Sequence, residues 1–396
     1  MSKKFWLIYA GYWCLFLGYS IFSYSLTAPN LVLSTNPDYW QWQTWMWQTF
    51  FNNRQLLTIT YSLILTGLFL GYGLLIYLFA TNQQRFNFKQ LIVAVLFLVL
   101  PLIFSNNALS YDVFNYIFNA KMVAVYHANP HVQTALEFST DTWTRFMHNT
   151  HTPAPYGYGW TALSMIPYAF GLGKFITTWV SFRLFSLLSL FLLMLIYQRY
   201  VKKINLQLFM VLFNPLLLIE VVSNSHNDLW MMVPAIVSLM LVSRQPQKIG
   251  WSLVLLLFSI SIKFATLILL PIWLGLVFYH RQSFFSNLLS NYWPLMASVL
   301  MFIPLLSTRS QLFHPWYLIW ALVWLPFIKS SHTWINLILI FSASSLFRYL
   351  PYLYYGQHTT QTLFQQQLVT WIPALLYLSL LLIKQLIFKL RAFKVQ

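Results

Sequence analysis

The sequence predicts an all-α polytopic membrane protein, and three observations support this fold class. Only 7% of the 396 residues are charged and 59% are hydrophobic, whereas soluble domains carry about 25% charged residues. Apolar runs of about 20 residues, long enough to span a bilayer, recur along the chain. The 18 tryptophans and 24 tyrosines suit aromatic belts at two membrane interfaces. Lipid is therefore the expected solvent for most of the surface.

The net charge of +17, from 23 lysines and arginines against six acids, does not indicate nucleic-acid binding. The basic residues are scattered at the ends of apolar segments and form no basic face or nucleic-acid motif. We interpret them as charges of inner loops. Cys14 is the single cysteine, which excludes an internal disulfide framework and a cysteine-rich metal site.

The apolar stretches predict helices in chain order. The first, 5–27, follows two lysines and has no convincing cleavage site, so we expect a retained anchor. The stretch 250–279 is too long for one span and has Lys263 in its middle, which predicts a hairpin that turns near Lys263. The stretch 158–172 predicts a partly embedded interfacial helix. The remaining spans are expected at 55–80, 90–105, 175–198, 205–222, 229–243, 288–306, 315–329, 333–350 and 367–388.

The distribution of lysine and arginine predicts the orientation. With both termini on the cytoplasmic side, fifteen of the 23 basic residues fall at the inner face. The long loops 28–54 and 106–174 and the shorter loop 351–366 then lie outside. No linker or repeat suggests a soluble domain, so residues 1–396 are expected to form a single membrane domain.

The six acids all fall on the expected outer side; they are Asp38, Asp112, Glu137, Asp141, Glu220 and Asp228. A carboxylate in or near lipid costs about 2.5–3.5 kcal/mol, so such residues are functional candidates. Helix capping is the alternative for Asp141 and Asp228, and turn or loop positions are the alternative for Asp38 and Glu137. Asp112 is the strongest candidate, because it follows a spanning helix and opens the aromatic segment 111–116.

Three further features have a structural and a functional interpretation. Arg183 lies on a predicted span and could form a structural ion pair with Glu220. The aromatic run 39–51 predicts an interfacial amphipathic helix, with a sugar-stacking surface as the alternative. The Gln-rich segment 357–367 predicts an outer loop that could cover a site.

Five motifs occur in order between about residues 110 and 320. They are Ser110-Tyr111-Asp112 with Tyr116, Ala120 and Ala128-Asn129-Pro130; Pro155-Tyr156-Gly157-Tyr158-Gly159-Trp160; His226-Asn227-Asp228; Lys263; and His314-Pro315-Trp316-Tyr317-Leu318. In this order they resemble the motifs of GT-C-fold glycosyltransferases, in the branch of polyprenyl-phosphate-mannose-dependent mannosyltransferases. The sequence departs from that pattern at Tyr158, where Pro is frequent, and at His131, where Tyr is usual.

The resemblance implies a GT-C-like bundle of about 11–13 transmembrane helices with juxtamembrane helices in the long outer loop. It also implies an inverting transfer of a hexose, with mannose expected, from a polyprenyl-phosphate donor to a lipid- or glycan-linked acceptor hydroxyl at the outer face. Asp112 is the expected general base. The expected substrate-binding residues are Tyr111, Tyr116, Asn129, Tyr156, His226, Asn227, Asp228, Lys263, His314, Trp316, Tyr317 and Arg348.

No cofactor is expected. A nucleotide-sugar donor usually needs a metal held by an Asp-x-Asp pair, which the sequence lacks, and this favours the lipid donor. The sequence leaves a divalent metal as an open alternative. We assign no ligands to it, because no two-histidine helical spacing is present. Lys263, Arg348, Arg183 and Lys174 are the candidates to stabilise the phosphate charge. The expected partners are the donor, the acceptor and the lipid bilayer, with no nucleic acid.

Two other functions compete with transfer. A transporter or a flippase for lipid-linked glycans could use Glu220, Arg183 and Lys263 along a pathway through the membrane. It predicts polar lining on both sides and often an internal repeat, whereas the carboxylates lie on one side and no repeat is evident. A non-catalytic scaffold predicts that the side chains of Asp112, His226, Asn227 and His314 do not converge in space.

Overall fold

The computed structural model describes residues 2–27, 34–81, 86–107, 109–279, 286–306, 313–329 and 331–393, and in these ranges every regular element is helical. The first third of the chain forms α1 (Lys3–Ser23), η1 (Tyr24–Leu26), α2 (Pro37–Met46), η2 (Trp47–Phe51), α3 (Arg54–Thr81), α4 (Phe88–Val99), η3 (Leu100–Phe104) and α5 (Asp112–Tyr126). This confirms the all-α membrane fold class.

The middle of the chain continues with two short turns and a set of packed helices. They are η4 (Ala135–Phe138), η5 (Thr142–Phe146), α6 (Tyr158–Phe170), α7 (Phe175–Tyr200), α8 (Leu206–Leu212), α9 (Pro215–Leu218), η6 (Ile219–Ser223), α10 (Asp228–Arg244), η7 (Pro246–Lys248), α11 (Ile249–Ile262), η8 (Phe264–Leu269) and α12 (Leu270–Tyr279).

The last part completes the bundle. Its elements are α13 (Ser286–Phe302), η9 (Ile303–Leu306), η11 (Pro315–Leu318), α14 (Ile319–Leu322), η12 (Leu325–Phe327), α15 (His332–Phe347), α16 (Leu350–Tyr355) and α17 (Thr360–Phe393).

Within the described ranges, five helical segments are long and apolar enough to cross a membrane. They are Lys3–Leu26, Arg54–Thr81, Phe175–Tyr200, His332–Tyr355 and Thr360–Phe388. A sixth crossing would combine Leu206–Leu212 with Pro215–Ser223, which meet at 41°. Shorter apolar helices stand at several other expected spans, for example Phe88–Phe104 and Asn291–Leu306. The total of about 11–13 spans stays a prediction.

The expected hairpin at 250–279 is present. α11 ends at Ile262, Lys263 has an extended backbone, and η8 and α12 continue the chain back past α10. Hydroxyl groups join the neighbouring segments: Ser238 and Ser252 exchange hydrogen bonds, and the Ser259 hydroxyl donates to the Met231 carbonyl. Such small polar contacts let helices pack closely in lipid.

Three expected elements differ from the structure. The span at 205–222 is broken between α8 and α9, because Asn214 caps a new helix whose first residue is Pro215. The span at 315–329 is divided into η11, α14 and η12, with prolines at the start of both 3₁₀ turns. The expected outer loop 351–366 is mostly helical, since α16 ends at Tyr355 and α17 begins at Thr360.

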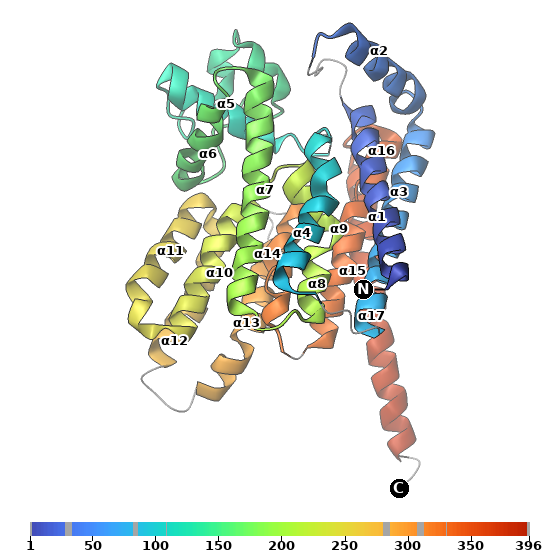
Figure 1. Ribbon diagram of the computed structural model, residues 1–396, viewed down its shortest axis with the longest axis vertical. Helices are drawn as coiled ribbons and strands as arrows, with labels where there is room; N and C mark the ends of the chain where they lie inside the picture. Colours follow the sequence, from blue (N-terminus) through green and yellow to red (C-terminus); the bar gives the residue numbers. More distant parts are fainter. Residues whose placement is uncertain are drawn as a thin grey trace.

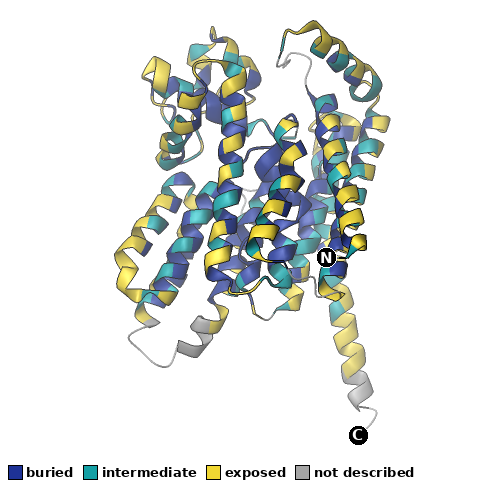
Figure 2. Ribbon diagram, viewed as in Figure 1, coloured by how far each residue is buried: buried dark blue, intermediate teal, exposed yellow. Residues whose placement is uncertain are grey.

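The segments expected outside the membrane lie together at one end of the bundle. Figure 1 shows α2, α5 and α6 at the upper end, while α17 extends beyond the lower end. Buried residues fill the centre, around α9 and α14, and exposed residues cover the outward faces (Figure 2). α2 confirms the helix expected in the aromatic run 39–51, and Trp40 and Trp45 are exposed on it.

Candidate active site

Asp112 opens α5 at the upper end of the bundle, where a negative side chain interacts favourably with the helix dipole. Its side chain is 21% exposed. The Tyr156 hydroxyl donates a hydrogen bond of 2.9 Å to Asp112 Oδ2, and His226 Nδ1 lies 3.5 Å from the same oxygen. The carboxylate is therefore held in place from two sides and still reaches solvent.

The segment of His226, Asn227 and Asp228 connects the π-helical turn η6 with α10. Ser225 has a left-handed backbone with φ 59°, and the His226 amide donates to the Glu220 carbonyl. These features turn the chain so that the His226 ring points back toward Asp112. The ring is fully buried and stacks on Trp316 at 3.9 Å between centroids.

Lys263 lies at the tip of the hairpin and pairs with Asp228. Its Nζ is 2.9 Å from Asp228 Oδ1, which also accepts a hydrogen bond from the Trp320 indole. The rings of Tyr156 and Tyr317 lie 5.6 and 5.4 Å from the ammonium, within the range of cation–π contacts. The ammonium is thus fixed next to the residues that hold Asp112.

Two glycines explain how the tip of the hairpin comes so close to the segment 155–160. The Gly157 amide donates to the Ile262 carbonyl at 3.0 Å. A Cβ at Gly157 or Gly159 would collide with Ser261. Only glycine lets the segment 155–160 pass against the tip of the hairpin, and this contact places Tyr156 between Asp112 and Lys263.

The motif 314–318 contributes stacked rings that contact the His226 side chain. His314 stacks on Trp316 at 4.3 Å, and Trp316 in turn stacks on His226. His314 lies one residue before the apolar segment Pro315–Phe327. Burial lowers the pKa of His314 to about 4; Asp112 opposes this shift, and Arg348 adds to it. His314 is therefore neutral at pH 7. Arg348 is itself buried, and its guanidinium donates a hydrogen bond of 3.2 Å to Thr370 Oγ1.

The other expected residues occupy different places. The Tyr111 ring stacks on His148 at 3.8 Å, and the buried Tyr116 ring packs edge-on against Tyr156 at 5.0 Å. Asn129 lies beyond the far end of α5, which is about 22 Å long. Its side chain contacts Tyr158 at 3.4 Å and accepts the amide of the residue after Pro130. Substrate binding by Asn129 stays a prediction.

The remaining acids have local partners away from this cluster. Asp141 accepts the Trp143 amide as a cap and pairs with Lys121. Glu137 completes a capping box with Thr134, and Asp38 lies in the first turn of α2. Asp228 is not the cap of α10, because Asn227 occupies that position. Asp112, Glu220 and Asp228 are the acids that converge.

The structural alternative for Arg183, an ion pair with Glu220, is wrong. The Arg183 guanidinium instead donates to the Leu102 and Ser105 carbonyls and to Asn107 Oδ1. It thereby supplies a donor to the Ser105 carbonyl just past the end of η3. The Leu102 carbonyl also accepts the Ser105 amide and hydroxyl, so Arg183 is a further donor there. Glu220 lies beside His226, with 3.4 Å between Oε2 and Nε2. Lys174, another expected cation, is exposed at the start of α7.

Sequence reasoning missed Trp320 and the partner of Glu220. Trp320 follows Trp316 by four residues, and helical spacing could have placed both rings on one face. Nothing in the sequence shows that Glu220 faces His226 rather than Arg183. Among the described residues, no three His, Cys, Asp or Glu side chains are grouped so as to hold a metal ion.

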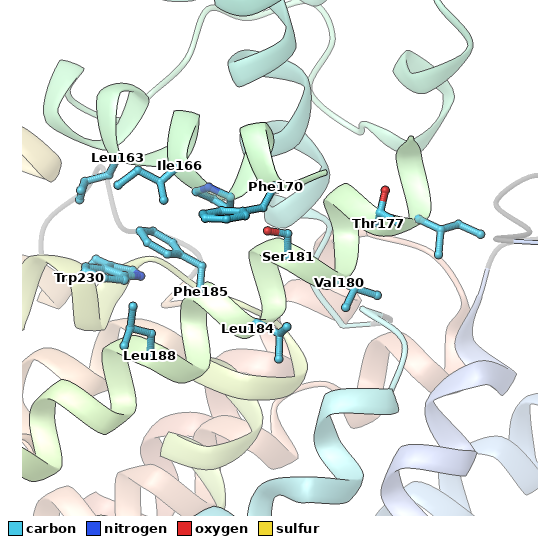
Figure 3. A pocket seen from close by; sticks show the side chains of 12 residues that line it. Leu163, Ile166, Phe170, Thr177, Val180, Ser181, Leu184, Phe185, Leu188 and Trp230 are labelled. Carbon is cyan, nitrogen blue, oxygen red and sulfur yellow. The ribbon is translucent and has the colours of Figure 1, made fainter. Parts of the chain in front are cut away.

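An apolar groove of about 700 Å³ lies beside the cluster, between α6 and α7. Figure 3 shows Ile166, Phe170, Leu184, Phe185 and Trp230 around it. Trp230 follows Asp228 by two residues and stacks on Phe185 at 4.1 Å. The groove and the polar cluster therefore share the start of α10 as a wall.

The comparisons with known proteins identify the family. A family model described as alpha-(1→6)-mannopyranosyltransferase, N-terminal domain, matches residues 20–279. The chain belongs to this family. The matched range includes Asp112, Tyr156, the segment 226–228 and Lys263 but ends before His314. No curated protein and no solved structure matched the chain.

Membership confirms the resemblance stated from the motifs. The protein is a membrane-embedded glycosyltransferase that transfers mannose. Membership in a family of transferases argues against the transporter and scaffold alternatives. The convergence of Asp112, His226 and His314 also runs against the scaffold, which predicted that these side chains lie apart.

Proposed function

We propose that the protein transfers mannose, with inversion, from a polyprenyl-phosphate donor to a hydroxyl of a lipid- or glycan-linked acceptor at the outer membrane face. An inverting enzyme forms an α-mannoside from a β-linked donor, and the family name suggests an α-(1→6) product. The family match supports mannose as the transferred sugar. The contacts of the converging residues support the donor and the mechanism.

One observation carries the choice of Asp112 as general base. Of the three carboxylates that converge, Asp228 and Glu220 are fully buried, whereas the Asp112 side chain is 21% exposed. Asp228 is also neutralised by Lys263. Asp112 is thus the carboxylate that an incoming hydroxyl can reach.

The reaction follows from this arrangement. Asp112 accepts the proton of the acceptor hydroxyl while the acceptor oxygen bonds to C1 of mannose. The bond from C1 to the phosphate oxygen breaks, and its electron pair leaves with the polyprenyl phosphate. Lys263 and Arg348 supply positive charge for this leaving group, and the neutral His314 can donate a hydrogen bond to it.

The apolar groove supports a donor with an isoprenoid tail. Its lining is almost wholly apolar, and Trp230 joins it to the polar cluster. A tail in the groove would place the phosphate near the start of α10, next to Lys263. Leu184→Arg would put a charge into the groove, so we expect a higher KM for a long-chain donor and a small change for a short-chain one.

The proposed base is tested with Asp112→Asn and the matched control Asp38→Asn, which changes an acid on α2 outside the cluster. Mannosyl transfer from polyprenyl-phosphate mannose is measured with purified protein in lipid discs. Removing a general base typically costs about 10²- to 10⁴-fold in rate, so we expect that loss in the first variant alone. Full transfer by Asp112→Asn would remove the proposed mechanism.

A further inference from the structure

Glu220 is a buried carboxylate that the proposed reaction does not use. It is fully buried in η6, and Oε2 accepts a hydrogen bond of 2.8 Å from Asn224 Nδ2. Among the described residues, no lysine or arginine pairs with Glu220, and its ion-pair partner is His226. A buried charge without a strong partner is costly and marks a functional candidate.

The His226 ring lies between two carboxylates. Nε2 is 3.4 Å from Glu220 Oε2, and Nδ1 is 3.5 Å from Asp112 Oδ2. The ring is immobilised by its stack on Trp316 and by complete burial. Each nitrogen therefore faces one carboxylate, and both distances can shorten to full hydrogen bonds with small movements.

The chemistry of imidazole determines the direction in which a proton can move between the two carboxylates. A neutral ring carries hydrogen on one nitrogen, and an ionised carboxylate can only accept. Each carboxylate favours hydrogen on the nitrogen that it faces. Glu220 is fully buried, whereas Asp112 is partly exposed and already accepts the Tyr156 hydroxyl on the same oxygen. Hydrogen on Nε2 is therefore favoured, which leaves the Nδ1 lone pair facing Asp112. Once Asp112 has taken a proton, its carboxylic acid can donate to Nδ1.

We propose that Glu220 is a positioning residue that acts through His226 on Asp112, and this inference rests on the proposed function. The proton leaves the acceptor oxygen for Asp112 and moves on to His226 Nδ1. The resulting imidazolium lies between two carboxylates, which stabilise its charge. Asp112 returns to its ionised form, and the proton later returns through Asp112 to solvent, so no other reactant is needed.

A purely structural role for Glu220 makes a different prediction. Its hydrogen bond with Asn224 lies within one turn of the chain, and a glutamine oxygen could accept it equally well. Glu220→Gln therefore keeps the local contact and the volume while it removes the charge that orients His226. A structural role predicts little effect from this exchange, or an effect that does not depend on His226.

The test is a double-mutant cycle of Glu220→Gln and His226→Gln, with kcat and KM measured for mannosyl transfer. We expect Glu220→Gln to lower kcat about 10- to 100-fold, less than the loss of a base, with KM for both substrates within about twofold. In the His226→Gln background, Glu220→Gln should change kcat by less than about twofold. An unchanged kcat, or equal losses in both backgrounds, would overturn the inference.

Thermal unfolding of each variant shows whether the fold survives. If Glu220→Gln does not fold, Glu220→Asp, which keeps the charge but shortens its reach, takes its place in the same cycle with the same expected dependence on His226. The two proposals fail separately. An active Asp112→Asn variant contradicts the proposed base, whereas an inactive one together with independent losses in the cycle contradicts only the role of Glu220.

Discussion

The pair of Lys263 and Asp228 offers a quantitative prediction, because it connects the tip of the hairpin to the start of α10. The two charged atoms are 2.9 Å apart, and Asp228 is fully buried. Its second oxygen, Oδ2, has no hydrogen-bond partner in the described structure. Lys263→Met keeps most of the side-chain length and removes the positive charge.

The expected cost follows from the geometry. Two charges at 2.9 Å attract each other by about 6 kcal/mol at an effective dielectric constant of about 20. Desolvation offsets part of this attraction, but a buried carboxylate that loses its partner typically costs about 3–5 kcal/mol. For a chain of 396 residues, a loss of this size in the free energy of unfolding lowers Tm by about 4–6 °C.

The assay compares thermal unfolding of Lys263→Met and of the double variant Lys263→Met with Asp228→Asn, at one scan rate in one detergent. The double variant leaves no buried charge, so we expect it to regain most of the stability. Both variants should transfer mannose poorly, because each lacks the ammonium. A single variant as stable as the parent, or a double variant no more stable than the single one, would show that the pair of Lys263 and Asp228 does not stabilise the fold.

Three further predictions follow from contacts of the site. Gly157→Ala should displace the hairpin at Ser261 and lower transfer at least about tenfold, whereas Gly250→Ala, with open space around its Cβ, should not; equal rates would contradict the close packing. Arg183→Met removes the donor of the buried Ser105 carbonyl and should cost about 1–3 kcal/mol in the free energy of unfolding; a variant as stable as the parent would show that this contact is dispensable. Because the pKa of His314 is lowered from 6.5 to about 4, the unfolded chain binds an extra proton between these values. Stability should then fall as pH drops from 6.5 toward 4, and His314→Gln should flatten this fall; an identical pH dependence would argue against a neutral buried ring.

Some features could be predicted from the sequence because local composition determines them. Low charge and apolar runs indicated the membrane class, and the position of Lys263 within 250–279 indicated the turn of the hairpin. Pro215 after Asn214 carried a signal for a new helix, but the apolar run around it concealed the break.

The partners of the buried charges could not be predicted in this way. Arg183 and Glu220 lie on neighbouring predicted spans, so an ion pair between them was reasonable. The structure joins each to a different segment, Arg183 to the end of η3 and Glu220 to the turn at His226. Such pairings depend on how far one helix is shifted or rotated against another, which hydrophobic pattern does not specify. The motifs placed Asp112, His226 and Lys263 in one site, but their order along the chain did not say which atoms meet.

The most direct test of Asp112 as the general base separates donor binding from the transfer step. Radiolabelled polyprenyl-phosphate mannose is bound to Asp112→Asn in lipid discs, and transfer is followed in a single turnover after addition of the acceptor. We expect donor affinity within about threefold of the parent and a rate of transfer lower by about 10²- to 10⁴-fold. Single-turnover transfer at the parental rate would contradict the assignment of Asp112 as the group that accepts the proton.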